Sequence, residues 1–330
     1  MEHQSPDLSR LTEQALRLLE RPRLRVPLLS APAAPPSSLT DDLDRLAAPD
    51  FKPDGPFLLR LAAKYGHAYA HGSQFDSVDD DDLTLFLDRF ANRRRGAESL
   101  RGKEGLRRDL LHSGFALCML LDLPRTAHVL REVLNTPVSG PAPFLGLDIG
   151  AGSGILMAAM HGAARRNGFE HPECLGIERD PAVRERGDRL TRSLGLGRIV
   201  AGDAKLPETF AGMAGRRIAF VCNETLPSQG RRLWKEDFTA ISAALLQALA
   251  DETRGAAFFP AALTAEAGPR GRVRLTPANR FAPETDGYPL RLMRAEGIEL
   301  DGRDMELSQV GKPYTGLVHP DWLLRLGRRW

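Results

Sequence analysis

L-G-L-D-I-G-A-G-S-G, from Leu145 to Gly154, is the stretch that decides the fold of this chain. Its first half alternates apolar residues with small or polar ones, a pattern that predicts a short buried strand. Its second half places glycines at three alternate positions. Residues 155–166, I-L-M-A-A-M-H-G-A-A-R-R, favour a helix with a basic carboxyl end. The sequence therefore predicts a strand, a glycine-rich turn and a helix in succession.

A glycine-rich turn between a strand and a helix is typical of ligand-binding α/β folds. Glycines adopt positive φ angles and let a ligand approach the backbone, while the first N–H groups of the helix face that ligand. Dinucleotide-binding folds use a similar turn. Here the acidic residue Asp148 lies inside the motif, and D-x-G-x-G-x-G resembles motif I of class I S-adenosylmethionine (SAM)-dependent methyltransferases. An ordinary glycine-rich turn is the alternative.

That resemblance implies a fold and a cofactor. The fold is Rossmann-like α/β, a mostly parallel sheet with helices on both faces, and the alternation of strands and helices agrees with right-handed βα units. The cofactor is SAM. In this family the glycine backbone packs beside the methionine and ribose parts of SAM. The residues expected to bind it here are Asp148, Gly150, Gly152 and Gly154.

The composition is that of an ordinary globular protein, with 330 residues, 42% of them hydrophobic and 27% charged. A net charge of +2 gives no electrostatic reason to expect nucleic acid or a membrane surface as a partner. We expect no transmembrane helix and no secretion signal, and a cytoplasmic location. We expect buried thiols, and neither disulfides nor a metal site, at Cys118, Cys174 and Cys222.

Three regions are expected: an N-terminal helical cap over 1–105, a SAM-binding core over 106–267, and an extension with short strands over 268–330. Apolar residues at helical spacing predict N-terminal helices over 4–20 and 57–70. From this helical content we expect the N-terminal region to close over the cofactor site.

Capping signals predict two further helix starts in the N-terminal region. Thr40 or Asp41 is the expected N-cap of one helix. Ser77 or an early member of the aspartate run 79–82 is the expected N-cap of a helix over 83–93. Acidic charges favour the positive end of a helix, which explains the aspartate run without a metal ion.

A second motif lies upstream of the glycine-rich turn. The segment M-L-L-D-L-P-R-T, residues 119–126, resembles the M-L-x-D-x-x-R-T segment of protein arginine methyltransferases. The resemblance implies that Arg125 pairs with the carboxylate of SAM, for which a guanidinium is well shaped. The alternative is a surface ion pair between Arg125 and Asp122. Pro124 departs from the family pattern and is expected to bend or restart the helix.

Further acidic residues follow the next two predicted strands. Glu178 ends the strand C-L-G-I-E, and the family places a carboxylate there to accept hydrogen bonds from the ribose hydroxyls of SAM. Asp180 and Pro181 then begin a helix as its N-cap and first residue. The family likewise places a polar side chain against adenine at the end of the third strand, where Asp203 and Ala204 are the candidates.

The fourth predicted strand, residues 217–224, ends in the pair of residues expected at the transferable group. Ligands of open α/β sheets lie beyond the carboxyl ends of the strands, so Asn223 and Glu224 are the candidate catalytic residues. In arginine methyltransferases this strand ends in the first of two glutamates that hold the substrate. Glu224 matches that residue, and Glu236 is the candidate for the second, at an unusually long spacing.

The C-terminal part matches the family less well. Residues 254–266 resemble the fifth strand of the arginine methyltransferases, where a proline follows the apolar strand and the chain continues extended. The long β-barrel of that family has no room in the residues that follow, and short strands are expected instead. Tyr314 and His319 are candidates for the substrate pocket, with packing in the core as the alternative.

We therefore expect a methyltransferase that acts on a nitrogen or oxygen nucleophile of a small molecule or protein side chain. One alternative is attack on the γ-carbon of SAM, which transfers the aminocarboxypropyl group or closes a ring and releases methylthioadenosine. A second is a non-catalytic SAM-binding regulatory protein, and a dinucleotide dehydrogenase is a distant third. The acceptor and the oligomeric state stay open, with a homodimer as one option.

Overall fold

The computed structural model describes residues 37–71, 78–87, 89, 115–121, 123–225, 235–259, 262–267, 273–278, 305–309 and 312–313. By the density of their contacts, residues 36–78 and 113–318 form one compact unit, and the remaining residues form another. Among the described helices, none is both long enough and apolar enough to cross a lipid bilayer.

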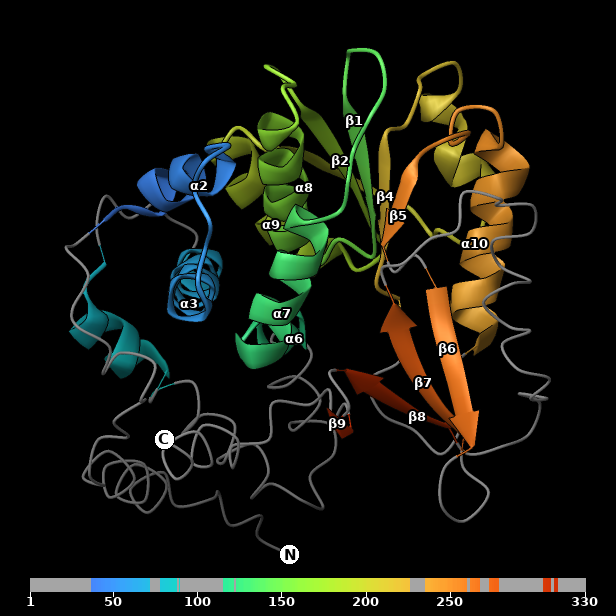
Figure 1. Ribbon diagram of the computed structural model, residues 1–330. Helices are drawn as coiled ribbons and strands as arrows, with labels where there is room; N and C mark the ends of the chain where they lie inside the picture. The colour runs from blue at the N-terminus through green and yellow to red at the C-terminus, as the bar shows by residue number, and fades with distance from the viewer. Residues whose placement is uncertain are drawn as a thin grey trace, which may run out of the picture. The chain divides into compact units, whose positions relative to one another are not determined.

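A five-stranded parallel sheet forms the centre of the larger unit (Figure 1). Its strands follow the order β3-β2-β1-β4-β5. They are β1 (Leu145–Ile149), β2 (Glu173–Glu178), β3 (Gly197–Ala201), β4 (Phe220–Asn223) and β5 (Ala257–Phe259). The order reverses between β1 and β4, which is the topological switch point of a doubly wound sheet. The Rossmann-like α/β fold predicted from the sequence is confirmed.

Helices cover both faces of this sheet (Figure 1). On one face α8 (Ile155–Arg166) and α9 (Pro181–Ser193) pack against the small side chains of β1 and β2. On the other face an apolar cluster joins the strands to η2 (Pro207–Met213), a 3-10 helix, and to α10 (Lys235–Leu249). The β1–β2–β4 register places Asp148, Gly176 and Cys222 side by side on the α8 face. As predicted, Cys174 and Cys222 are buried free thiols.

Two N-terminal helices form a second layer on the α8 side. Helix α2 (Leu39–Ala47) packs on α8, and α3 (Gly55–His71) packs on α7 (Leu123–Leu134) and α9. The guanidinium of Arg166 fastens this layer by donating to the carbonyls of Leu46 and Phe51, at 2.7 and 2.6 Å. The helix predicted over 57–70 is confirmed as α3, whereas the helix predicted over 4–20 lies outside the described residues.

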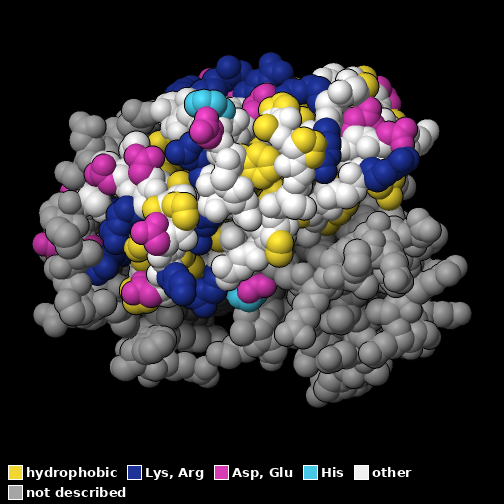
Figure 2. Space-filling model, turned by 45° about the horizontal axis from the view of Figure 1, so that its top comes forward, with side chains coloured by type: hydrophobic (Ala, Val, Ile, Leu, Met, Phe, Trp, Pro, Cys, Tyr) yellow, Lys and Arg dark blue, Asp and Glu magenta, His cyan; other side chains and the backbone are white. Residues whose placement is uncertain are grey.

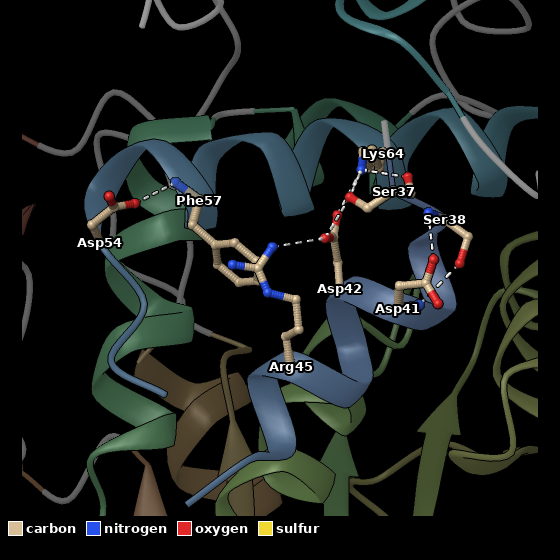
Figure 3. A network of polar contacts seen from close by, with 8 residues as sticks. All are labelled: Ser37, Ser38, Asp41, Asp42, Arg45, Asp54, Phe57 and Lys64. Carbon is tan, nitrogen blue, oxygen red and sulfur yellow. Dashed lines mark hydrogen bonds and ion pairs between the residues drawn. The ribbon is translucent and has the colours of Figure 1, made fainter. Parts of the chain in front are cut away.

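The N-caps of two N-terminal helices can be compared with the predicted ones. The N-cap of α2 is Ser38, so the assignment to Thr40 or Asp41 is wrong (Figure 3). Ser38 Oγ accepts from the Asp41 amide, and Asp41 Oδ2 accepts from the Ser38 amide, both at 3.0 Å. This reciprocal pair is a capping box, with Ser38 as the N-cap and Asp41 as the third residue of the helix. In the other unit Asp79 Oδ1 accepts from the Asp82 amide at 2.8 Å, as expected of an early aspartate at the start of a helix.

The chain beyond β5 forms a second sheet of four strands. They follow the order β6-β7-β8-β9, namely β6 (Ala262–Ala267), β7 (Val273–Ala278), β8 (Met305–Gln309) and β9 (Lys312–Pro313). As predicted, the apolar strand β5 ends just before Pro260 and the chain continues extended, as β6. β6 pairs antiparallel with β7, so it does not belong to the parallel sheet.

Acidic and basic side chains are interspersed on the described surface seen in Figure 2, with hydrophobic groups between them. This mixture agrees with the near balance of charges in the sequence, 45 basic against 43 acidic residues.

A buried ion pair joins α2 to α3 (Figure 3). Lys64 Nζ lies 2.7 Å from Asp42 Oδ2 and also donates to the carbonyl and hydroxyl oxygens of Ser37, at 2.7 and 2.9 Å. Both charged side chains are only 5% exposed. Breaking such a pair from one side leaves a buried charge without its partner, which costs more than replacing both residues.

We therefore expect Lys64→Met to lower the free energy of unfolding by about 3 kcal/mol, because Asp42 then stays buried with only the guanidinium of Arg45 as a cation, 4.0 Å from its Oδ1. The double variant Lys64→Met/Asp42→Leu should recover most of that loss. Denaturant unfolding of the three proteins measures both effects. A double variant as unstable as the single one would show that the pair itself is stabilising.

Candidate cofactor-binding site

Three carboxylates gather at the carboxyl ends of neighbouring strands. Asp148 lies near the end of β1, Glu178 ends β2, and Glu224 directly follows β4. Alternation along β1 and β2 puts Asp148 and Glu178 on the α8 face, because Asp148 lies opposite Gly176 in the ladder. The negative charges of Glu224 and Glu178 both act on Asp148. The structure thus brings these three predicted site residues together.

Asp148 is a buried carboxyl group without a full set of hydrogen bonds. Its side chain is 1% exposed, and Oδ2 has no hydrogen-bond partner among the described residues. Burial raises the pKa of Asp148 to about 8, and the charges of Glu224 and Glu178 add to the effect. An unpartnered buried acceptor is costly, so this atom is suited to a donor on a ligand.

The glycine-rich loop has a backbone conformation that only glycine adopts easily. Gly150, Gly152 and Gly154 have φ angles of +73°, +55° and +79°. A Cβ on Gly150 would also lie 3.0 Å from Thr225 Cγ2, beyond the end of β4, and one on Gly154 would collide with Thr191 of α9. The loop is therefore packed closely between the strand ends and α9.

The amides of this loop are used inside the protein. Those of Gly150 and Ala151 donate to the carbonyl of Ile177, at 2.9 and 3.0 Å. The amide of Gly154 donates to the carbonyl of Ala151 at 2.7 Å. The amide of Gly152 donates to Oε2 of Glu178 at 3.0 Å. Four of the loop's amides thus have protein acceptors, and one of these acceptors is a carboxylate.

Glu178 is held by two backbone amides. Besides the bond from Gly152, its Oε1 accepts from the amide of Asp180 at 2.9 Å. Asp180 in turn caps α9 by accepting from the Ala182 and Val183 amides, as the sequence predicts. A carboxylate oxygen has two lone pairs, so each oxygen of Glu178 still has acceptor capacity for a hydroxyl.

The loop after β3 lies beside Glu178, since the Gly202 amide donates to the Glu178 carbonyl at 3.3 Å. Asp203 folds this loop by accepting from the Lys205 amide at 3.1 Å, and its other oxygen lies 4.0 Å from Arg179. The Ala204 side chain is 8% exposed and belongs to the core under η2 and α10. Asp203 is therefore the more accessible of the two predicted adenine contacts.

The side chain of Asn223 is buried on the side of the sheet that faces α10, which the sequence did not indicate. Its side chain is 2% exposed and lies on the α10 face, opposite in direction to Asp148. The amide group donates to Ser242 Oγ at 3.4 Å, and its oxygen accepts from the Thr225 hydroxyl at 2.6 Å. These bonds shape the turn that carries Glu224, and the Asn223 side chain is not brought together with the three carboxylates.

Other predicted residues are placed only in part. Arg125 lies in the first turn of α7, and Glu236 lies at the start of α10; the structure describes neither side chain. Tyr314 and His319 lie outside the described residues. Thr126 of the second motif is buried and donates to the carbonyl of Leu120, which ends α6 (Phe115–Leu120). As predicted for the segment around Pro124, the helix restarts there: α6 ends at Leu120 and α7 begins at Leu123, one residue before Pro124.

Tyr65 of α3 is a site residue that the sequence analysis missed. Its ring is fully buried, and its hydroxyl donates to the carbonyl of Ser153 in the glycine-rich loop at 3.1 Å. Burial raises the pKa of Tyr65 far above its usual range, and the nearby charge of Asp148 adds to this. Its helix was predicted, but no sequence motif links residue 65 to residue 153.

Comparison with known proteins gives little further guidance. No protein-family model matches the chain, and no curated protein is similar to it. Among solved structures, the chain is similar to the mitomycin 7-O-methyltransferase MmcR, at 15% identity and a TM-score of 0.31. The match covers 67% of this chain and 53% of that chain, so this chain matches about half the length of that protein. A likeness this distant carries no argument about activity.

The raised pKa of Asp148 predicts a dependence of stability on pH. In the unfolded chain Asp148 loses its proton above about pH 3.8, whereas in the folded protein it keeps the proton up to about pH 8. Its contribution to stability is therefore complete below pH 3.8 and is lost as the pH rises through 8. The limiting slope is about 1.4 kcal/mol per pH unit.

Asp148→Asn removes this ionisation, so its free energy of unfolding should fall less steeply than that of the wild type between pH 4 and 8. Urea unfolding at several pH values measures the two slopes. Asp251→Asn, which changes an exposed aspartate, is the control and should keep the wild-type slope. Equal slopes in Asp148→Asn and the wild type would mean that Asp148 is ionised throughout this range.

Proposed function

We propose that this chain is a SAM-dependent methyltransferase that acts on a nitrogen or oxygen nucleophile of a small molecule or protein side chain. The observation that carries this proposal is that the amides of the glycine-rich loop already have acceptors within the protein. Gly150, Ala151, Gly152 and Gly154 all donate within the protein, and the carboxylate of Glu178 occupies the Gly152 amide. The pyrophosphate of a dinucleotide needs free donors and no negative charge at such a loop.

The residues present suit SAM better than a dinucleotide. SAM carries a sulfonium and an ammonium group and no phosphate, so a site edged by the carboxylates of Glu178 and Glu224 and by the carboxyl group of Asp148 favours it electrostatically. Glu178 would accept from the ribose hydroxyls, and Asp148 Oδ2 would gain the donor that it lacks in the protein. Asp203 is proposed for the adenine, and Arg125 for the carboxylate of SAM.

When bound, SAM supplies a methyl group that its sulfonium has already activated. The chain must then align a nucleophile with that group and manage its proton. Glu224, whose charge acts on Asp148, would orient the nucleophile or take its proton. Asn223 would act indirectly, through Glu224, because its hydrogen bonds to Ser242 and Thr225 fix the turn that carries Glu224. An arginine side chain is one proposed acceptor. This part of the proposal is supported only by the resemblance of residues 119–126 and of Glu224 to the arginine methyltransferases.

Binding of S-adenosylhomocysteine by calorimetry tests the cofactor site. Glu178→Gln should weaken binding about 10- to 100-fold, because a hydrogen bond to a charged group contributes about 1.5–3 kcal/mol. Glu173→Gln is the matched control, since Glu173 begins the same strand and its side chain is 47% exposed. Glu173→Gln should bind like the wild type. Equal affinity in all three proteins would remove Glu178 from the site.

Glu224→Gln separates binding from turnover. We expect this variant to keep its affinity for S-adenosylhomocysteine within about threefold and to lose about 100-fold or more of methyl transfer, as expected for a general base. Methyl-labelled SAM, offered with a panel of amine and hydroxyl acceptors, measures the transfer. Mass spectrometry of the nucleoside product decides the reaction: S-adenosylhomocysteine supports methyl transfer, and methylthioadenosine would contradict it in favour of attack at the γ-carbon.

A further inference from the structure

Helix α3 reaches the glycine-rich loop through one buried side chain. Tyr65 lies 88 residues before Ser153, and its hydroxyl donates to the Ser153 carbonyl at 3.1 Å. Tyr65 also lies against the next loop residue, because a Cβ on Gly154 would be 3.3 Å from the hydroxyl oxygen. Ser153 is itself only 5% exposed, so water cannot easily replace the tyrosine as a donor.

The Ser153 carbonyl lies between the two glycines that connect the loop to Glu178 and to α8. Ser153 stands between Gly152, whose amide holds Glu178, and Gly154, which precedes α8. Both glycines have positive φ angles and little intrinsic preference for one conformation. A hydrogen bond to the Ser153 carbonyl holds the peptide group between Ser153 and Gly154. Only the rotatable backbone bonds of Gly152 and Ser153 separate this group from the Gly152 amide, so holding it limits the directions open to that amide and to the Glu178 carboxylate that it binds.

Tyr65 is in turn held rigidly in α3. The preceding residue, Lys64, forms the buried ion pair with Asp42 of α2. The following residue, Gly66, approaches Leu121 so closely that a Cβ would lie 2.6 Å from its Cδ2 atom. Anchors on both sides of Tyr65 in the sequence leave its hydroxyl little freedom to follow a moving loop, so it acts as a fixed point for that loop.

We propose that Tyr65 is a positioning residue of the cofactor site, whose hydroxyl holds the glycine-rich loop in the conformation that presents Glu178 to the ligand. The inference deepens the proposed function and rests on it for the identity of the ligand. It also makes helix α3 a part of the cofactor site. Tyr65 does not contact the reacting atoms in this account; it acts through Ser153 and Gly152.

Tyr65→Phe tests the proposal, because it removes only the hydroxyl. The matched control is Thr253→Val, which removes a buried hydroxyl that donates to the Leu249 carbonyl at 2.7 Å, at the carboxyl end of α10. Three quantities are measured for both variants and the wild type: the melting temperature, the amide hydrogen exchange of residues 150–154, and the affinity for S-adenosylhomocysteine.

Both variants should melt at lower temperature than the wild type, since each loses one buried hydrogen bond. Only Tyr65→Phe should exchange the loop amides faster and bind S-adenosylhomocysteine more weakly, each by about 3- to 10-fold, the size expected for one such bond. Unchanged loop exchange and affinity in Tyr65→Phe would overturn the proposal and leave Tyr65 a structural residue. A wild type that does not bind S-adenosylhomocysteine would defeat the proposed function, and loop exchange would still decide the role of the hydroxyl.

Discussion

The hydrogen bond from the Gly152 amide to Glu178 is the interaction on which the rest of the site depends. It joins the loop after β1 to the end of β2, and the second bond of Glu178, from the Asp180 amide, extends the connection to the start of α9. One carboxylate thereby fixes three elements relative to one another. In the proposed function it also favours SAM over a dinucleotide, since the Glu178 carboxylate repels a phosphate and its oxygens can accept from hydroxyl donors.

The site stores an electrostatic cost that a cationic ligand would relieve. Asp148 is buried near Glu178 and Glu224, and its pKa of about 8 reflects both burial and their charges. Bringing positive charge to this edge of the sheet favours the ionised carboxylate and stabilises the complex. Asp148 lies beside the switch point between β1 and β4, which is where a doubly wound sheet binds its ligand. The electrostatic cost of burying Asp148 is thus located at the expected ligand site.

The sequence was sufficient for the parallel sheet and for the order of the acidic residues along the strand ends. Alternating apolar residues, glycines and the Asp180–Pro181 helix start are local signals, and the structure follows them. The hydrogen bond of Asn223 to Ser242 of α10 and the hydrogen bond of Tyr65 to the glycine-rich loop are different. Neither contact leaves a pattern in the sequence, because each joins segments that only the tertiary fold brings together.

The most direct test of the central claim is a side-by-side calorimetric titration of the full chain with S-adenosylhomocysteine and with NADH. Both ligands carry an adenosine with ribose hydroxyls, but only NADH carries a pyrophosphate. An account in which Glu178 occupies the Gly152 amide predicts binding of S-adenosylhomocysteine and no measurable binding of NADH. Preferential binding of NADH would contradict it, because the loop would then have to release Glu178 and offer its amides to a phosphate.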